Sequence, residues 1–163
     1  KGLKIIKVKT SDQMFNAVKN SLPVDVAVCT AAVSDFKPIV IKKNKIKKSN
    51  KKENIILDKT VDILNYLGKN NYHRPKLVVG FSAETENLMK NSKNKLKSKN
   101  ADWIIANDVS RKNIGFNKDH NEVTIIEANG KISKIKKNKK SFIASVISGK
   151  IINSLLINDK NLN

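Results

Sequence analysis

The sequence predicts an α/β protein with a mostly parallel sheet flanked by helices. Short apolar runs rich in β-branched residues alternate along the chain with stretches of helical periodicity, which is the signature of such folds. The run 24–29 is almost continuously apolar, as strands buried on both faces are. The 163 residues, of which 39% are hydrophobic, suit one domain with its own core.

In the first part of the chain, 3–8 reads as a strand, and Ser11 is a residue able to cap the helix expected at 11–20. A second strand, 24–29, leads into a long polar segment, 34–53, that holds Pro38 and a dense lysine cluster. A loop of this length within a compact domain is usually functional or mobile.

The rest of the chain repeats the alternation and ends in a hairpin and a helix. The hairpin, 122–135, is expected to turn at Asn129-Gly130, because this dipeptide favours tight hairpin turns. The other expected strands are 55–57, 77–81 and 101–106, and the other expected helices are 60–70, 85–99 and 140–156.

The charge is strongly unbalanced, with 33 Lys and Arg against 14 Asp and Glu and a formal net charge of +19. One interpretation is a nucleic-acid binder, since cationic surfaces displace counterions from phosphates. The other is a biased composition combined with a site for an anionic small molecule. Arginine occurs only at Arg74 and Arg111 and aromatic residues make up 5%, which argues against readout of bases. We therefore favour the anionic small molecule.

A single cysteine, Cys29, excludes an internal disulfide and fits a reducing compartment. No run approaches the about 20 apolar residues that cross a bilayer. These features predict a cytoplasmic protein without a membrane partner.

Polar residues follow several expected strands at the edge where ligands of open α/β sheets bind. Asp35 follows 24–29 and is suited to a ribose hydroxyl or to Mg²⁺, although a turn or capping role is the alternative. Phe81 ends 77–81, where its ring would pack on a base or simply join the core. Glu84 either belongs to this edge or begins the next helix. Asn107 and Asp108 follow the strand 101–106, and they either form a turn or belong to the site.

Lysines supply candidate phosphate contacts. Lys95 and Lys99 are four residues apart and share one helix face, and the cluster at 42–48 lies in the long loop. Cations of this kind neutralise phosphoryl charge, whereas a solvated lysine run is the alternative. No phosphate-binding glycine loop, nucleophile elbow or Cys/His metal spacing is present.

Five motifs occur in an order and spacing that resemble the ligase half of bacterial bifunctional phosphopantothenoylcysteine decarboxylase/synthetase flavoproteins. They are AAVSDFKP (31–38), KIKK (45–48), KTVDIL (59–64), VGFSAET (79–85) and ANDV (106–109) followed by GFNKDHNEV (115–123). The resemblance covers roughly residues 1–130 and implies a Rossmann-like ligase domain over 1–163.

The resemblance implies that 4'-phosphopantothenate and cysteine are the substrates in coenzyme A biosynthesis. The phosphopantothenate carboxylate attacks the α-phosphate of CTP, and the cysteine amine then displaces CMP from the acyl-cytidylate. CTP with Mg²⁺ is thus the expected co-substrate, the metal ligands stay unassigned, and FMN belongs to the decarboxylase domain, which this sequence does not contain. The family's ligase domains dimerise, so a homodimer is expected, and the 122–135 hairpin offers an exposed edge for it.

Position by position, the resemblance assigns Lys45 to conversion of the acyl-cytidylate. It assigns nucleotide contacts to Asp35, Val61, Asp62, Ile63, Leu64, Phe81, Lys95 and Lys99. Val61 and Ser34 depart from the residues common in the family, Pro and Ala, without removing a side chain that the chemistry needs.

The front of the family's ligase domain, with its first strand and an important asparagine, has no counterpart before Lys1. We therefore expect an N-terminally truncated domain that needs this segment or a decarboxylase domain as a partner. The alternative function is a non-enzymatic, cationic nucleic-acid-binding domain or an inactive remnant of the ligase.

Overall fold

The computed structural model describes residues 2–41, 44–45, 54–70, 72–109 and 118–160, and the chain falls into two compact units. The first unit comprises Lys1–Leu22 and Ala32–Ile63, and the second comprises Pro23–Ala31 and Leu64–Asn163. The sequence predicts one domain over 1–163, and no change in its composition marks this boundary.

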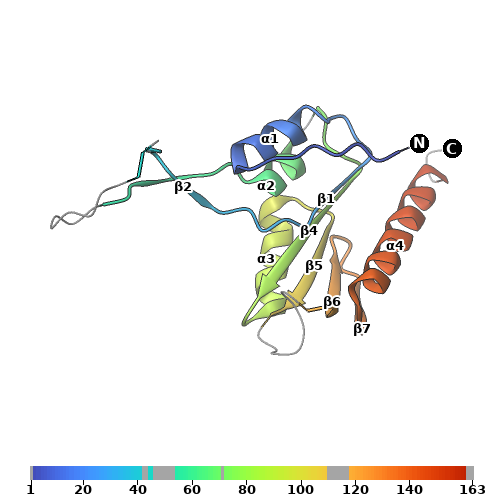
Figure 1. Cartoon of the computed structure of the whole chain (residues 1–163). Coiled ribbons are helices and arrows are strands. Elements are labelled where there is room, and N and C mark those ends of the chain that lie inside the picture. Colours follow the sequence, from blue (N-terminus) through green and yellow to red (C-terminus); the bar gives the residue numbers. More distant parts are fainter. Residues whose placement is uncertain (1, 42–43, 46–53, 71, 110–117, 161–163) are drawn as a thin grey trace. The chain divides into compact units, whose positions relative to one another are not determined.

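A single mixed sheet of five strands, in the order β1-β4-β5-β6-β7, forms the centre of the second unit (Figure 1). Its strands are β1 (Val26–Cys29), β4 (Leu77–Glu84), β5 (Trp103–Asp108), β6 (His120–Glu127) and β7 (Ile132–Lys139). β1, β4 and β5 run parallel to one another, and β6 and β7 are antiparallel to their neighbours. The predicted α/β class is therefore confirmed, with the parallel strands in one half of the sheet.

Helices cover both faces of this sheet. The helices are α2 (Ile63–Lys69), α3 (Leu88–Lys99) and α4 (Lys140–Lys160). Alternate strand residues such as Val79 and Ile105 pack in one core cluster with Ile143 and Ile147 of α4. On the other face, Gly80 lies so close to Leu64 that an added Cβ would sit 2.5 Å from its Cδ2 atom. Within the described ranges, no helix is long and apolar enough to cross a membrane.

The C-terminal hairpin forms where it was predicted. Gly130 adopts φ 90°, a backbone conformation that residues with a side chain rarely adopt. Its amide donates to the Glu127 carbonyl, and the Lys131 amide donates to Asn129 Oδ1. The turn therefore sets the register in which Ile126 lies opposite Ile132.

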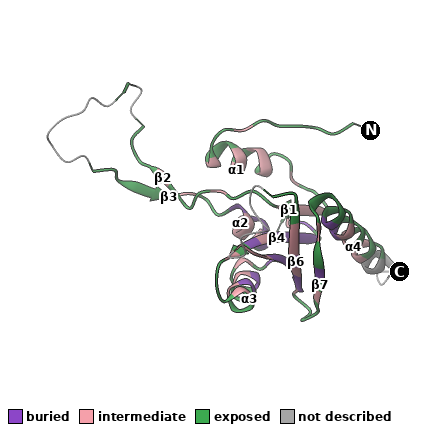
Figure 2. Ribbon diagram, turned by 60° about the horizontal axis from the view of Figure 1, so that its bottom comes forward, coloured by how far each residue is buried: buried purple, intermediate pink, exposed green. Residues whose placement is uncertain are grey.

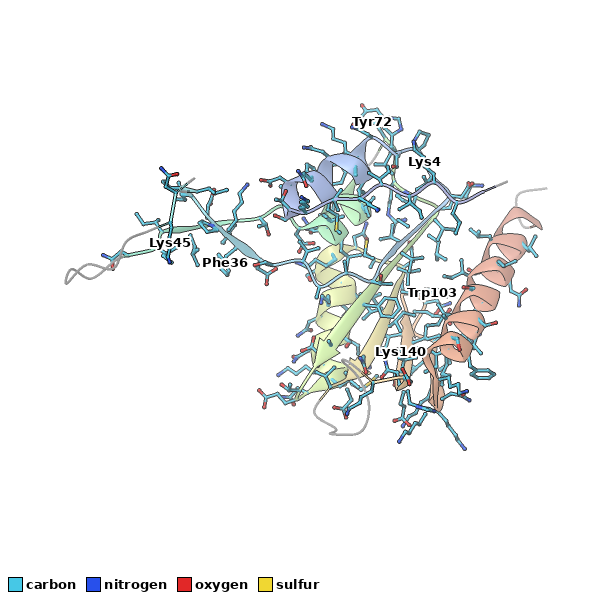
Figure 3. The ribbon with its side chains drawn as sticks, in the orientation of Figure 1. Lys4, Phe36, Lys45, Tyr72, Trp103 and Lys140 are labelled. Carbon is cyan, nitrogen blue, oxygen red and sulfur yellow. The ribbon has the colours of Figure 1, made fainter. Side chains whose placement is uncertain are left out.

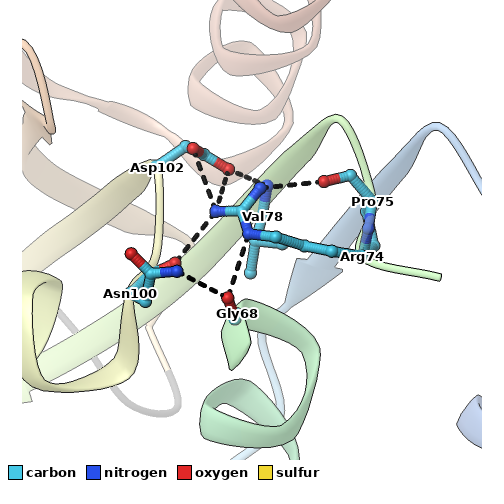
Figure 4. Close-up of polar contacts among 6 residues, drawn as sticks. All are labelled: Gly68, Arg74, Pro75, Val78, Asn100 and Asp102. Carbon is cyan, nitrogen blue, oxygen red and sulfur yellow. Dashed lines mark hydrogen bonds and ion pairs between the residues drawn. The ribbon is translucent and has the colours of Figure 1, made fainter. Parts of the chain in front are cut away.

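A cluster around Arg74 joins the helices to the start of the parallel strands (Figure 4). The Arg74 guanidinium donates to the Gly68 carbonyl at 3.0 Å, to the Asn100 carbonyl at 2.9 Å and to both Asp102 carboxylate oxygens at 3.0 and 3.1 Å. Asp102 also accepts the Val78 amide at 2.6 Å. One side chain thus links the ends of α2 and α3 to β4 and to the residue preceding β5.

The first unit contains the helix α1 (Ser11–Lys19) and a separate two-stranded ribbon, β2 (Phe36–Pro38) with β3 (Leu57–Lys59). Thr10 caps α1 and forms a capping box with Gln13, so the cap lies one residue before the predicted Ser11. Apart from Ile63, the buried hydrophobic residues that the structure describes belong to the second unit (Figure 2).

The predicted strand at 3–8 is wrong, because the structure has no strand there. Leu3 is 95% exposed and Ile5 is 78% exposed, so the run pairs with neither described sheet and buries little of its apolar surface. The tendency of β-branched residues to form strands expresses pairing and burial, and neither is available to this run.

Other predicted elements occur with different bounds. β2 forms inside the segment 34–53, which was expected to be a loop, because Phe36 pairs with Lys59 and Pro38 with Leu57. Both strands of this ribbon are edge strands, where the missing amide of Pro38 is tolerated. β4 continues to Glu84 because 82–84 pair with 106–108 of β5. The helices expected from 60 and 85 begin at Ile63 and Leu88, and the last helix extends to Lys160.

We predict that Gly68→Ala destabilises the protein by about 3 kcal/mol or more, because overpacked cores cost energy when nothing can yield. An added Cβ would lie 2.0 Å from the Lys99 carbonyl oxygen, which belongs to the backbone. Gly149→Ala is the matched control, since nothing lies within 4 Å of its added Cβ. That helix substitution should stabilise by about 0.5–1 kcal/mol in urea unfolding. Equal effects of the two substitutions would contradict the packing at Gly68.

We also predict that Arg74→Met lowers the free energy of unfolding by about 2–4 kcal/mol, because it leaves several acceptors unpaired. Lys76→Met is the control, because Lys76 forms an exposed ion pair with Asp25. The Lys76 side chain is 59% exposed and the Asp25 side chain is 70% exposed. Such surface pairs contribute about 0–1 kcal/mol. A loss at Arg74 no larger than that at Lys76 would show that the cluster is dispensable.

Candidate functional site

The carboxyl ends of β4 and β5 carry the candidate residues of the second unit. Cys29, the last residue of β1, lies opposite Gly80, so β4 runs four residues past the end of β1, to Glu84. Its neighbour β5 ends opposite Glu84, at Asp108. This edge lies at the opposite strand ends from the Arg74 cluster, which leaves it available for a ligand.

The Phe81 ring joins the core, which is one of the two roles considered for it, and a base contact stays a prediction. Its side chain is partly buried and packs against the core cluster that contains Ile143 and Ile147 of α4. Its carbonyl oxygen accepts a hydrogen bond from Lys95 Nζ at 3.4 Å. The ring thus belongs to the face that α4 covers, whereas the carbonyl is contacted by a lysine of α3.

Lys95 and Lys99 lie on successive turns of α3, as predicted, and both side chains are half-buried. Of the two, Lys95 is the one placed against β4, through the Phe81 carbonyl. Lys99 is at the end of α3, where its carbonyl faces Gly68. The two lysines therefore share one face of α3, with Lys99 nearer the end of the helix that contacts Arg74.

A polar cluster at the end of β4 was only partly foreseen from the sequence. The Ser82 hydroxyl donates to Glu84 Oε1 at 2.5 Å, and Asn91 Nδ2 donates to Glu84 Oε2 at 3.1 Å. Glu84 is a strand residue and does not begin the following helix. The sequence offers the alternation of Ser82 and Glu84 as a signal, but nothing that singles out Asn91.

Leu64 is the member of the segment 61–64 that belongs to the second unit. Its side chain packs against Gly80, the residue before Phe81. Val61, Asp62 and Ile63 belong to the first unit, and Val61 is 42% exposed. The predicted nucleotide-contacting segment thus crosses the boundary between the units at the start of α2.

Within the first unit, Asp35 lies next to the same segment of chain. The Thr60 amide donates to the Asp35 carbonyl at 3.0 Å, and the Thr60 hydroxyl donates to the Ser34 carbonyl at 2.5 Å. The Asp35 side chain is exposed. Two candidate positions that are 26 residues apart, Asp35 and Val61, are therefore neighbours through Thr60.

Lys45 lies in the connection between β2 and β3, with an exposed side chain. Figure 3 shows it beyond Phe36, along the chain that leaves β2. Residues 46–48, the rest of the KIKK motif, and the lysines at 42–43 lie outside the described residues, as does 110–117 of the connection 107–120.

No group of three or more His, Cys, Asp or Glu side chains with metal-binding geometry occurs among the described residues. Asn107 Oδ1 is buried and has no hydrogen-bond partner in that part of the chain. The described site can thus offer cations and single carboxylates to a ligand, but it holds no preformed cage for a bare metal ion.

Comparison with known proteins identifies a family. Residues 1–155 match the model of the DNA/pantothenate metabolism flavoprotein C-terminal domain. The coenzyme A biosynthesis bifunctional protein CoaBC of Bacillus subtilis is 39% identical over 132 residues, which cover 80% of this chain and 32% of that protein. CoaBC of Borreliella burgdorferi is 38% identical over 149 residues, which cover 90% of this chain and 37% of that protein.

A further relative, a cysteine/cysteine sulfinic acid decarboxylase, is 34% identical over 151 residues, or 42% of its length. The chain thus spans about a third to two fifths of the curated relatives that it matches. The crystal structure of the C-terminal domain of CoaBC matches with a TM-score of 0.72 and 30% identity, covering 94% of this chain and 66% of that one. A complex of a Cab2 mutant with phosphopantothenate-cysteine shares the fold, with a TM-score of 0.66 and 19% identity.

Proposed function

The chain belongs to the family of DNA/pantothenate metabolism flavoprotein C-terminal domains, and we propose that it is the nucleotide-binding part of a phosphopantothenate–cysteine ligase in coenzyme A biosynthesis. Two CoaBC proteins, which are named for coenzyme A biosynthesis, share 38% and 39% identity with it. The proposal extends to an enzyme that consumes CTP and acts in the cytoplasm.

The proposed reaction has two steps. The carboxylate of 4'-phosphopantothenate attacks the α-phosphate of CTP, and pyrophosphate leaves as the acyl-cytidylate forms. The amine of cysteine then attacks the acyl carbon, so that an amide bond forms and CMP leaves. Neither step uses a protein nucleophile, so catalysis depends on positioning and on cations near the phosphates.

The observation that carries the proposal is the contact between Lys95 and β4. The Lys95 ammonium lies 3.4 Å from the carbonyl of Phe81, the first residue of β4 beyond the end of β1, and ligands of such folds bind beyond the carboxyl ends of the strands. Within the second unit, the proposal gives phosphate binding to Lys95 and Lys99, and nucleotide contacts to Leu64 and Phe81. The residues of the first unit keep the roles that the resemblance assigns to them, which are nucleotide contacts for Asp35, Val61, Asp62 and Ile63 and conversion of the acyl-cytidylate for Lys45.

Magnesium enters this scheme as part of the substrate. A Mg²⁺ ion usually keeps several waters and is held by nucleotide phosphates with one or two carboxylates. The lack of a three-residue metal group among the described residues fits such a shared ion. Asp35, whose side chain is exposed, is a carboxylate suited to this contact.

We further infer a homodimer formed through the β2–β3 ribbon. Phe36, Ile39, Val40, Ile41, Ile55, Ile56 and Leu57 are 52–81% exposed, and the Ile39 amide donates to the Ile56 carbonyl, which continues the ribbon. A two-stranded ribbon is marginally stable alone in water, so a second ribbon would cover its apolar side chains. The predicted 122–135 edge is less suitable, because β7 presents exposed lysines at 134, 136, 137 and 139, which oppose edge pairing.

Thermal unfolding with Mg²⁺ and CTP tests nucleotide binding. A ligand at about 100 times its dissociation constant stabilises the folded state by about 2.7 kcal/mol, which raises the midpoint by about 5–11 °C. We expect a larger shift with CTP than with ATP and none with duplex DNA. A shift with DNA alone would replace the ligase by the cationic nucleic-acid binder.

Substitutions in the enzyme that contains the domain test the residue roles. Lys45→Ala should lower the rate of phosphopantothenoylcysteine formation by at least about a hundredfold, as removal of a preorganised cation does. Lys4→Ala, at another exposed lysine of the same unit, should leave the rate unchanged. Phe81→Leu retains an apolar side chain in the core. It should reduce the free energy of nucleotide binding by more than it reduces the free energy of unfolding. Full activity of both Lys45→Ala and Phe81→Leu would refute the assignment.

Light scattering after gel filtration tests the homodimer. The double substitution Val40→Lys and Ile56→Lys should convert a dimer into monomers, since it places charges in the apolar contact. Ile152→Lys, at a residue of α4 that is 56% exposed, should leave the dimer intact. A monomeric unsubstituted protein, or a dimer that survives the double substitution, would disprove this interface.

A further inference from the structure

Three polar residues next to the candidate site form a connected network that the proposed reaction does not use directly. Ser82 is 1% exposed, and its hydroxyl donates to Glu84 Oε1 at 2.5 Å. Asn91 of α3 donates from Nδ2 to Glu84 Oε2 at 3.1 Å. Each carboxylate oxygen of Glu84 thus accepts one hydrogen bond, one from its own strand and one from the helix.

The strand fixes where this carboxylate lies. Glu84 pairs with Asp108, and its carbonyl accepts the Val109 amide at 3.0 Å. Ser82 and Glu84 are two residues apart, so their side chains project from the same face of β4. Because Phe81 lies on the opposite face, the carboxylate is directed toward α3 and away from the core cluster under α4.

The start of α3 depends on contacts of this kind, because its own cap is weak. Asn87 precedes the helix with φ 51°, in the left-handed region, and its side chain makes no capping hydrogen bond. Within α3 only Ser92 and Leu96 are buried. A carboxylate close to the first turn is favoured by the helix dipole, and Glu84 supplies one through Asn91.

Asn91 also ties the helix to the preceding loop, because its Nδ2 group donates to the Glu86 carbonyl at 3.2 Å. Asn91 and Lys95 are four residues apart and therefore lie on the same stripe of α3. Asn91 contacts Glu84 and Lys95 contacts the Phe81 carbonyl, so two links one turn apart join the helix to β4. Two such links fix both the rotation of α3 about its axis and its position along the strand.

We propose that Ser82, Glu84 and Asn91 are positioning residues that hold α3 so that Lys95 and Lys99 meet the phosphates of the nucleotide. This inference rests on the proposed function, since it assigns the network to the same nucleotide site. The network touches no reacting atom; it acts through the two lysines. Removing it lets the helix rotate or slide, which costs nucleotide affinity without removing a phosphate contact.

Titration of the protein with Mg²⁺-CTP, followed by calorimetry, measures this effect. Asn91→Ala should weaken binding about tenfold, the effect of losing a hydrogen bond to a charged group. Asn91→Asp should weaken it more, because a second carboxylate would face Glu84. Asn94→Ala is the matched control, since Asn94 is an exposed asparagine of the same helix. The affinity of the Asn94→Ala protein for Mg²⁺-CTP should stay within about twofold of that of the unsubstituted protein.

A double substitution separates positioning from general stability. In a Lys95→Met background, Asn91→Ala should lower affinity by less than about twofold, because the network would have lost the main group through which it acts. Independent losses that multiply would overturn the proposal, as would equal affinities of Asn91→Ala and Asn94→Ala while the unsubstituted protein binds CTP.

Amide hydrogen exchange without ligand tests the network by itself. Exchange at Asn91–Lys95 amides should accelerate in Asn91→Ala and not in Asn94→Ala, and unchanged exchange would overturn the inference while leaving the proposed function standing. Failure of the unsubstituted protein to bind CTP, with the exchange difference present, would overturn the proposed function and the nucleotide role assigned to the network.

Discussion

The fold of the second unit depends on the guanidinium of Arg74. It donates to the Gly68 carbonyl, which also accepts from Asn100 Nδ2 at 2.7 Å, to the Asn100 carbonyl after α3, and to the Asp102 carboxylate, and so it helps to satisfy carbonyls at helix ends. Asp102 in turn binds the Val78 amide of β4. A planar group with five donors is the side chain that can make all these bonds together, and a lysine cannot replace it.

This arrangement separates the structural task from the binding task. The Arg74 cluster lies where β4 and β5 begin, and the polar residues Ser82, Glu84 and Asn107 lie where the same strands end. α3 returns the chain from the carboxyl end of β4 to the start of β5. It therefore begins beside Glu84 and ends beside Gly68. The rigid edge fixes the end of the helix, and the network fixes its start, which determines where Lys95 and Lys99 lie.

The first unit is organised differently, because its described polar contacts lie mostly at exposed positions. The capping box of α1, the ion pair of 2.7 Å between Lys37 and Asp12, and the bonds of Thr60 are its main described polar contacts. Exposed ion pairs of this kind contribute little stability. The exposed apolar side chains of the β2–β3 ribbon are consistent with a unit that gains its stability from association.

The sequence by itself determined the α/β class, most helices and strands, and the hairpin turn at Asn129-Gly130, because periodicity and turn chemistry are local properties. It also determined the family, since the motifs carry that information residue by residue. Only the tertiary structure decided that Phe81 turns its ring toward the core, that β4 continues to Glu84 and that 3–8 forms no strand. These outcomes depend on pairing with residues distant in the chain: Ile105 opposite Phe81, Asp108 opposite Glu84, and no described partner for Ile5. Local preference sets which residues can form a strand, and a pairing partner decides whether they do.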